Sequence, residues 1–407
     1  MVAMRLIALA LFICIPASSQ GNVTDRVRPP ICACTGQIPT YPAGTEPLCD
    51  AATRSSVIIT LGGTGQPDLV LTCARDGAGR YAWVGVGQQN TNTFVNSRNV
   101  GGCPLFPDDN VWNSRADSLL VDPGSDAIIG TFAANRLGTA PSMAINLATS
   151  GTPAFHVSFG GNPQSDGGSY PITGGMQMEG YGFNASFPVS GGPYNGDAHL
   201  LVIQTDQCKL YEIYALGSAT PPYSGGSGAI FDLMANDLRP DGWTSSDAAG
   251  LPIWPGILTY GEVYGAGEIQ HMIRFTVNST RDTYIWPARH YASHNDSASV
   301  PPMGSRWRLK ATFNEATCAA DEHVGGTFPP EVQRIIRALK RYGMILADNG
   351  LPILITTDSD PRWGDPNSSS SPNWIFNGWT HCIRGSDFEV VDTSTMMANP
   401  NSSAVAK

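Results

Sequence analysis

Gly267 to Val277 reads GEIQHMIRFTV, and this stretch decides the fold that the sequence predicts. Successive side chains of a β-strand point to opposite faces of a sheet. Here one face receives His271, Ile273, Phe275 and Val277, whereas the other receives Met272, Arg274 and Thr276. The alternation predicts a β-strand over residues 268–277 with one apolar face directed toward a core.

Further strand-like runs lie on both sides of this stretch. They are residues 198–206, 208–214, 283–286, 306–313 and 344–357. The first two predict an antiparallel hairpin, and we expect two more, one joining 268–277 to 283–286 and one within 344–357 through its Asn-Gly turn. Together with 45 glycines and 31 prolines, these runs predict an all-β fold: a two-sheet sandwich resembling a jelly roll, with disulfide-tied loops.

One docked helix is predicted near residues 329–342. Pro329, Pro330 and Glu331 suit the first turn of a helix, and Gly343 ends it. The apolar stripe of this helix comprises Val332, Ile335, Ile336 and Leu339. Shorter helical segments are expected around residues 122–129 and 244–250.

Four segments divide the chain. Residues 1–19 combine a basic start, an apolar run and small residues, as a secretory signal peptide does. Residues 20–100 form a Cys-rich segment with three predicted strands, 101–395 the main β-sandwich domain, and 396–407 a tail. Because the apolar run is too short to span a bilayer, we expect a secreted, extracellular protein.

Cysteines, glycosylation sites and charge agree with this localisation. Eight of the nine cysteines follow the signal, and we expect up to four disulfides whose pairing the sequence leaves open. Six Asn-x-Ser/Thr sites would carry glycans in a eukaryotic secretory pathway: Asn22, Asn184, Asn278, Asn295, Asn367 and Asn401. A net charge of −10 argues against nucleic acid as a partner, and no later apolar run predicts membrane insertion.

The order of motifs from Cys103 onward resembles a family of secreted proteins of bacteria and fungi. The phrases that carry the resemblance are CPLFPDDNVWN, GSGAIFDL, LRPDGWTSSDAAGLPI, IRFTV, YIWPARHYAS, PPMGSRWRLK, LKRYGMILADNG and DPRWGD. The resemblance implies export and carries no set of catalytic residues. Residues 20–100 lie outside it.

Candidate catalytic residues come from the stretch between Gly225 and Lys310, where Asp, His, Arg and Trp gather among strand-like runs. The sequence contains no HExxH, P-loop, G-x-S-x-G or Rossmann glycine motif. Asp232 and Asp247 are candidate glycosidase carboxyls, since such enzymes need one acid and a second carboxylate. A solvated or backbone-bonded loop residue is the alternative for each.

A second candidate set suits a polysaccharide lyase, which needs a base and a cation that neutralises a uronate. This set is His271, Arg274 and His290. His271 shares a face with apolar residues, so a buried core histidine is the favoured alternative for it. Metal binding by His290 together with His294 and His271 is disfavoured.

Candidate substrate-binding residues are Trp243, Trp286, Arg289 and Arg306. Sugars pack their flat C–H faces on aromatic rings, whereas core packing is the alternative. Asp108 and Asp109 could bind calcium, although a solvated turn is the preferred interpretation. We expect no other metal or cofactor.

The leading functional hypothesis is a secreted carbohydrate-active enzyme that cleaves an extracellular polysaccharide, as a glycoside hydrolase or a polysaccharide lyase. A non-catalytic glycan-binding or extracellular structural protein explains the same aromatic residues. A secreted effector or adhesin that binds another protein is a third hypothesis. The sequence leaves the choice between enzyme and binder open.

Overall fold

The computed structural model describes residues 40–42, 57–61, 69–75, 81–85, 99–179, 197–217, 220–265, 267–318, 328–364, 378, 380 and 382–406. The chain divides into two compact units, Met1–Gln88 and Gln89–Lys407. Several predicted features lie outside the described residues: the signal peptide, the glycosylation sites Asn22, Asn184 and Asn367, and the cysteines Cys32, Cys34 and Cys49.

The first unit contains one four-stranded sheet in the order β1-β2-β3-β4. Its strands are β1 (Thr40–Pro42), β2 (Val57–Leu61), β3 (Leu69–Arg75) and β4 (Tyr81–Gly85). β1 pairs with β2 in parallel, and the other pairs are antiparallel. The three strands expected in this segment are therefore confirmed as β2, β3 and β4.

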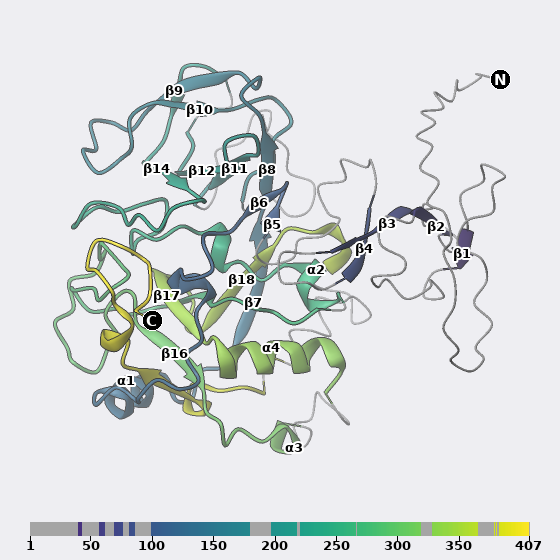
Figure 1. Cartoon of the computed structure of the whole chain (residues 1–407). Coiled ribbons are helices and arrows are strands. Elements are labelled where there is room, and N and C mark those ends of the chain that lie inside the picture. Colours follow the sequence, from purple (N-terminus) through teal and green to yellow (C-terminus); the bar gives the residue numbers. More distant parts are fainter. Residues whose placement is uncertain are drawn as a thin grey trace, which may run out of the picture. The chain divides into compact units, whose positions relative to one another are not determined.

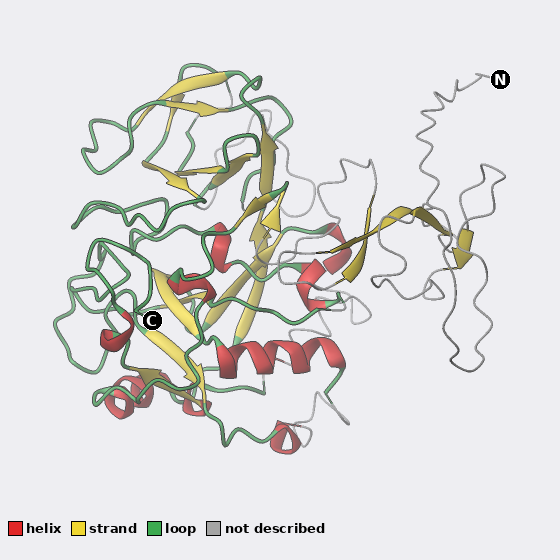
Figure 2. Cartoon of the chain, viewed as in Figure 1, coloured by secondary structure: helices red, strands yellow, loops and turns green. Residues whose placement is uncertain are grey.

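The second unit is mostly β-sheet (Figures 1 and 2). Its six-stranded sheet has the order β19 (Phe388–Val391), β16 (Arg306–Leu309), β17 (Met344–Asn349), β15 (Ile273–Val277), β18 (Leu354–Asp358) and β7 (Gly138–Met143). The four-stranded sheet has the order β14 (Ser227–Asp232), β12 (Lys209–Tyr214), β11 (Leu200–Gln204) and β8 (Ile145–Ala148). Smaller sheets join β10 (Ser169–Pro171), β9 (Ala154–Ser158) and β13 (Tyr223–Ser224), and β5 (Asn99–Val100) with β6 (Cys103–Pro104).

Four α-helices accompany these sheets among the described residues. They are α1 (Ser125–Phe132), α2 (Tyr260–Val263), α3 (Glu315–Cys318) and α4 (Pro330–Arg341). α4 confirms the long predicted helix and packs against β16, and α1 confirms the short helix expected around residues 122–129. Short 3-10 turns occur at Val111–Asn113, Trp254–Gly256, Pro361–Trp363, Gly385–Asp387 and Ser394–Met396.

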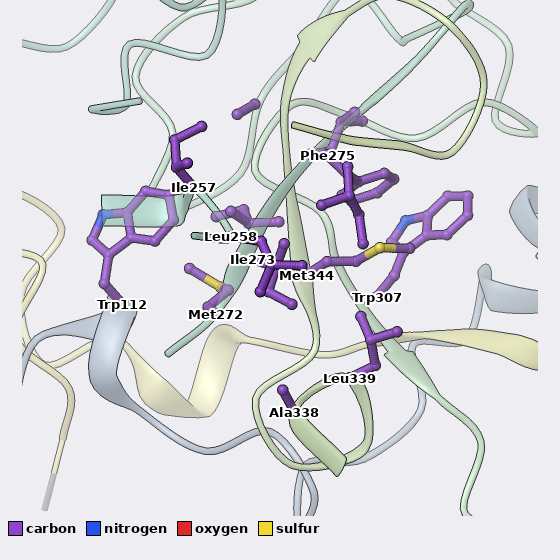
Figure 3. Close-up of a cluster of buried hydrophobic side chains, with 14 of the residues drawn as sticks. Trp112, Ile257, Leu258, Met272, Ile273, Phe275, Trp307, Ala338, Leu339 and Met344 are labelled. Carbon is purple, nitrogen blue, oxygen red and sulfur yellow. The ribbon is translucent and has the colours of Figure 1, made fainter. Parts of the chain in front are cut away.

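The main core gathers side chains from both large sheets, from α4 and from the segments around Trp112 and Ile257, part of which Figure 3 shows. Ile273, Phe275 and Val277 of β15 are all completely buried, as the alternating pattern predicts. Phe275 packs on the Trp307 ring with centroids 5.1 Å apart, and Leu339 of α4 joins the same cluster. Burial of such large side chains stabilises a fold by about 1.5–3 kcal/mol each.

Two of the three predicted hairpins are wrong. The strands at 344–357 form β17 and β18, but β15 lies between them, parallel to β17 and antiparallel to β18. β15 is buried along its whole length. In the centre of the sheet it pairs with a strand on each side, whereas a hairpin with 283–286 would give it only one neighbouring strand. Residues 283–286 form only one isolated bridge, from Tyr284 to Met303, whereas the hairpin of β11 and β12 is confirmed.

Residues 244–250, expected to begin a helix, form an irregular loop instead. Ser245 explains the difference, because its hydroxyl accepts the Asp247 N–H at 2.9 Å and donates to the Leu251 carbonyl at 2.6 Å. Such side-chain bonds compete with helical backbone bonds. Gly250 has φ +71°, and a Cβ there would lie 2.4 Å from the Trp243 carbonyl oxygen, so only glycine fits the turn.

Contacts between segments that are far apart in sequence join the last residues of the second unit to its earlier parts. The predicted tail, residues 396–407, includes Ser402 and Ala404, which form bridges with Asp237 and Asn110. Asn110 Nδ2 donates to the buried Ser403 hydroxyl across 293 positions of sequence.

A disulfide joins Cys103 to Cys208, and Cys382 is also disulfide-bonded. The first bridge spans 105 positions, so its loss would enlarge the unfolded ensemble. We expect the double variant Cys103→Ala/Cys208→Ala to lose about 2–5 kcal/mol of unfolding free energy, measured by urea denaturation. An unchanged urea midpoint would contradict this expectation.

Candidate active site

A buried ion pair between Asp247 and Arg274 forms the centre of the candidate site. Arg274 Nε lies 2.5 Å from Asp247 Oδ2, and Nη2 lies 2.5 Å from Oδ1, so the contact is bidentate. Nη1 of the same guanidinium donates to the Thr356 hydroxyl at 2.7 Å. The Asp247 side chain is fully buried and that of Arg274 is 4% exposed. The structure therefore brings together two residues that the sequence predicted as catalytic candidates. Because both are buried, they position neighbouring groups.

Asp348, at the end of β17, extends this pair toward solvent. Its Oδ2 lies 3.7 Å from Arg274 Nη2, and its side chain is 21% exposed. Burial and the adjacent Asp247 raise the pKa of Asp348 well above its usual range, and a hydrogen bond between the two carboxyls adds to the effect. Asp348 therefore keeps its proton to a higher pH than an ordinary aspartate does.

Glu179 and His199 form the second half of the site. His199 Nδ1 contacts Glu179 Oε2, and the Ser142 hydroxyl donates to Glu179 Oε1 at 3.2 Å. Burial opposes the charged forms of both residues. Their mutual attraction outweighs burial, which lowers the pKa of Glu179 and raises the pKa of His199 to about 9. His199 is 2% exposed and Glu179 16% exposed, so the carboxylate is the solvent-facing member.

We call Glu179, His199, Asp247, Arg274 and Asp348 the Arg274 cluster. Arg274 lies on β15, Asp348 on β17 and His199 immediately before β11. Glu179 and Asp247 lie in loops. Asp348 and Glu179 both perturb Arg274, and both perturb the phenol of Tyr214, which is 37% exposed. The cluster therefore places two carboxyl groups, whose pKa values are shifted in opposite directions, near one buried guanidinium.

Glu212 of β12 fixes the loop that carries Asp247. It accepts the Ser246 hydroxyl at 2.8 Å and the backbone N–H groups of Ile253 and Trp254 at 2.9 and 3.1 Å. The Ser246 carbonyl in turn bonds His199 Nε2 at 2.8 Å. Burial outweighs these hydrogen bonds and raises the pKa of Glu212 to about 7.

Glu212 gives the second unit a pH-dependent stability. The folded carboxyl binds its proton up to about pH 7, whereas the unfolded carboxyl releases it near 4.5, so stability declines as pH rises through this interval. Between about pH 5 and pH 8 we expect wild type to lose on the order of 2 kcal/mol more than Glu212→Gln. Urea denaturation at both pH values measures the difference, with Glu331→Gln in the first turn of α4 as a matched control. Parallel pH profiles of wild type and Glu212→Gln would contradict the assignment.

Glu179, Asp197 and His199 are the residues that could hold a metal ion in the described part of the chain. Each offers one ligand atom, and these atoms lie within 4.8 Å of one another. Imidazole and carboxylate ligands suit transition-metal ions. In the structure His199 and Glu179 neutralise each other directly, so we interpret them as an ion pair.

Three other candidate residues have structural contacts. His271, 2% exposed, bonds Glu262 at 3.1 Å and the Met272 carbonyl at 2.9 Å, as the core alternative predicted. Arg306 is 1% exposed and donates to the carbonyls of Ser114 and Tyr342, and burial lowers its pKa to about 9. Asp232 is exposed at the end of β14 and accepts the Met234 N–H at 2.9 Å. None of these contacts joins them to the Arg274 cluster.

Of the remaining candidates, Trp286 and Arg289 contact residues 400–402, whereas His290 and Trp243 have other partners. The indole N–H of Trp286 donates to the Ser402 carbonyl at 2.8 Å, and buried Arg289 donates to the Pro400 carbonyl at 2.8 Å. Partly exposed His290 bonds the Ala248 carbonyl at 2.9 Å, next to Asp247 in the chain. The half-buried Trp243 ring packs under the Arg239 guanidinium, 5.7 Å away.

Scans against family models, curated proteins and solved structures find no match to this chain. Its function must therefore be argued from the Arg274 cluster itself. Within the described residues, no helix combines the length and apolarity needed to cross a bilayer.

Proposed function

We propose that this protein is a secreted glycoside hydrolase that cleaves an extracellular polysaccharide. The observation that carries the proposal is a pair of partly exposed carboxyl groups near Arg274, of which Asp348 has a raised pKa and Glu179 a lowered pKa. Glycosidases require such a pair, since one carboxyl protonates the leaving oxygen while the other acts as base or nucleophile.

In the proposed reaction, Asp348 donates its proton to the glycosidic oxygen as the bond from that oxygen to the anomeric carbon breaks. Glu179 either removes a proton from the attacking water or attacks the anomeric carbon itself. In the second case water then hydrolyses the glycosyl ester, and Asp348 acts as base. Arg274 pairs with Asp247, and His199 supplies positive charge that lowers the pKa of Glu179.

Hydrolysis is favoured over a lyase reaction by the surroundings of the cations. A lyase needs a cation free to bind a uronate and a base that reaches the C5 proton. The Arg274 guanidinium is already engaged by Asp247 and Thr356, and both ring nitrogens of His199 have partners. His271 is similarly engaged within the core.

Secretion fits the disulfide between Cys103 and Cys208 and the exposed sites Asn278 and Asn401, which we propose carry glycans. The resemblance to secreted bacterial and fungal proteins points the same way. A jelly roll is built from antiparallel strands, whereas β15/β17 and β7/β18 are parallel pairs. The jelly-roll connectivity therefore stays a prediction.

The test is incubation of residues 20–407 with an array of polysaccharides, followed by mass spectrometry of released oligosaccharides. Products that contain one added water support hydrolysis. Products lighter by one water, with a new ultraviolet absorbance, would indicate a lyase. Retention on a glycan without release would indicate the non-catalytic binding protein instead.

A further inference from the structure

A pocket of about 440 Å³ lies where β7 runs into β8. Residues 143–147, 173–177 and 358–361 line it together with Trp254. Ala144 separates β7 from β8, so the chain passes here from the six-stranded to the four-stranded sheet. The volume falls within the range of about 300–1,000 Å³ that is typical of small-molecule sites.

The pocket adjoins the Arg274 cluster through two chain segments. Met143 lines the pocket, and its neighbour Ser142 donates its hydroxyl to Glu179. Gln177 also lines the pocket, two residues before Glu179. Consecutive Cα atoms lie about 3.8 Å apart, so the Cα atoms of Gln177 and Glu179 lie within about 8 Å of each other. The pocket therefore begins close to the residue that carries the proposed catalytic carboxylate.

Asp358 gives the pocket its chemistry. Its Oδ1 accepts the Tyr260 N–H at 2.9 Å and the Trp363 indole N–H at 2.8 Å, whereas Oδ2 has no bond among the described residues. Burial raises the pKa of Asp358 to about 7, so this carboxyl can donate or accept a hydrogen bond near neutral pH. Asp360 is already paired with Arg362.

The residues that line the pocket include two carboxyl groups and no Lys, Arg or His. An anionic ligand would meet the Asp358 carboxyl, and Arg362 is already engaged by Asp360, so the lining residues offer the ligand no free cation in this partly buried site. Hydroxyl groups suit Asp358 and the neighbouring Ser359 and Thr173, and an ammonium group suits the ionised form of Asp358. The face of a sugar ring that carries C–H groups can pack on exposed apolar lining such as Leu147.

We propose that this pocket is a subsite for a sugar unit without negative charge, next to the bond that the Arg274 cluster cleaves. The inference rests on the proposed hydrolase function and narrows its substrate to neutral or amino-sugar polysaccharides. Uronate polymers are excluded by the same charge argument.

The test compares wild type with Gln177→Trp. Gln177 is exposed, so the larger side chain fills the mouth of the pocket. The backbone N–H and carbonyl of residue 177 keep their hydrogen bonds to the Asn146 side chain. Asp358→Asn is the second variant, and Asp126→Asn at an exposed position of α1 is the control. The probes are xylan and β-glucan oligosaccharides, chitosan oligosaccharides, and polygalacturonate and alginate oligosaccharides. We expect Gln177→Trp to lower kcat/KM for the cleaved neutral or amino oligosaccharide at least about tenfold, while a one-sugar nitrophenyl glycoside changes less than about twofold.

The outcomes separate the subsite from the hydrolase function. Cleavage restricted to neutral probes or to chitosan supports the subsite and tells the two sugar classes apart. Cleavage of polygalacturonate or alginate that neither variant impairs would overturn the subsite and leave a hydrolase. Binding of neutral or amino oligosaccharides that Gln177→Trp abolishes, without cleavage by wild type, would support the subsite and overturn the hydrolase.

Discussion

Asp348→Asn is expected to lower kcat on the cleaved polysaccharide by about two to four orders of magnitude, the usual contribution of a general acid. The asparagine amide can still donate a hydrogen bond to Asp247, so the Arg274 cluster keeps its geometry, but it has no proton to give to the leaving oxygen. Reducing-sugar release measures the rate, and urea denaturation checks that unfolding free energy changes by less than about 1 kcal/mol.

Asp126→Asn provides the matched control, because the same substitution is made at an exposed residue of α1. Wild-type rates in Asp348→Asn, with an intact fold, would remove Asp348 from the mechanism. Loss of activity in both variants would point to a cause outside the site.

Arg274→Met is expected to destabilise the second unit by about 3–5 kcal/mol, since it leaves the fully buried Asp247 carboxylate without its partner. The methionine retains much of the apolar stem but none of the three hydrogen bonds that Arg274 donates. Urea denaturation followed by circular dichroism measures the change.

The double variant Arg274→Met/Asp247→Leu tests the cause. When both charges are removed, no unpaired buried carboxylate remains, and we expect recovery of at least about 2 kcal/mol relative to Arg274→Met. A double variant as unstable as the sum of the two single variants would show that the loss comes from packing.

Local patterns predicted the strand at the centre of the sheet and the residue on it that organises the candidate site. The alternation over 268–277 gave β15 and set Arg274 on the face opposite Phe275. The density of charged residues between Gly225 and Lys310 drew attention to Asp247. Both inferences rest on spacing within a few residues, which the sequence displays directly.

The other half of the site depends on long-range pairing. Asp348 stands before an Asn-Gly pair that predicts a hairpin turn, and only the insertion of β15 beside β17 sets it near Arg274. Glu179 follows a Gly-rich loop with no periodic pattern. His199 is buried immediately before an apolar strand, and its carboxylate partner lies 20 positions away. The one sequence signal for His199 is that a polar residue stands directly before an apolar, strand-like run.

The bond between Asn110 and Ser403 has a consequence for the order of events during synthesis. The two residues are separated by 293 positions, so the early part of the second unit leaves the ribosome long before its partner exists. Contacts of such high sequence separation slow folding, because the intervening chain must be closed first. Until residue 403 emerges, the Asn110 amide and the Val111 N–H lack the acceptors that Ser403 supplies in the finished protein. The nascent chain therefore spends most of its elongation time without these two hydrogen bonds, and the start of the second unit can complete its contacts only when synthesis is nearly finished.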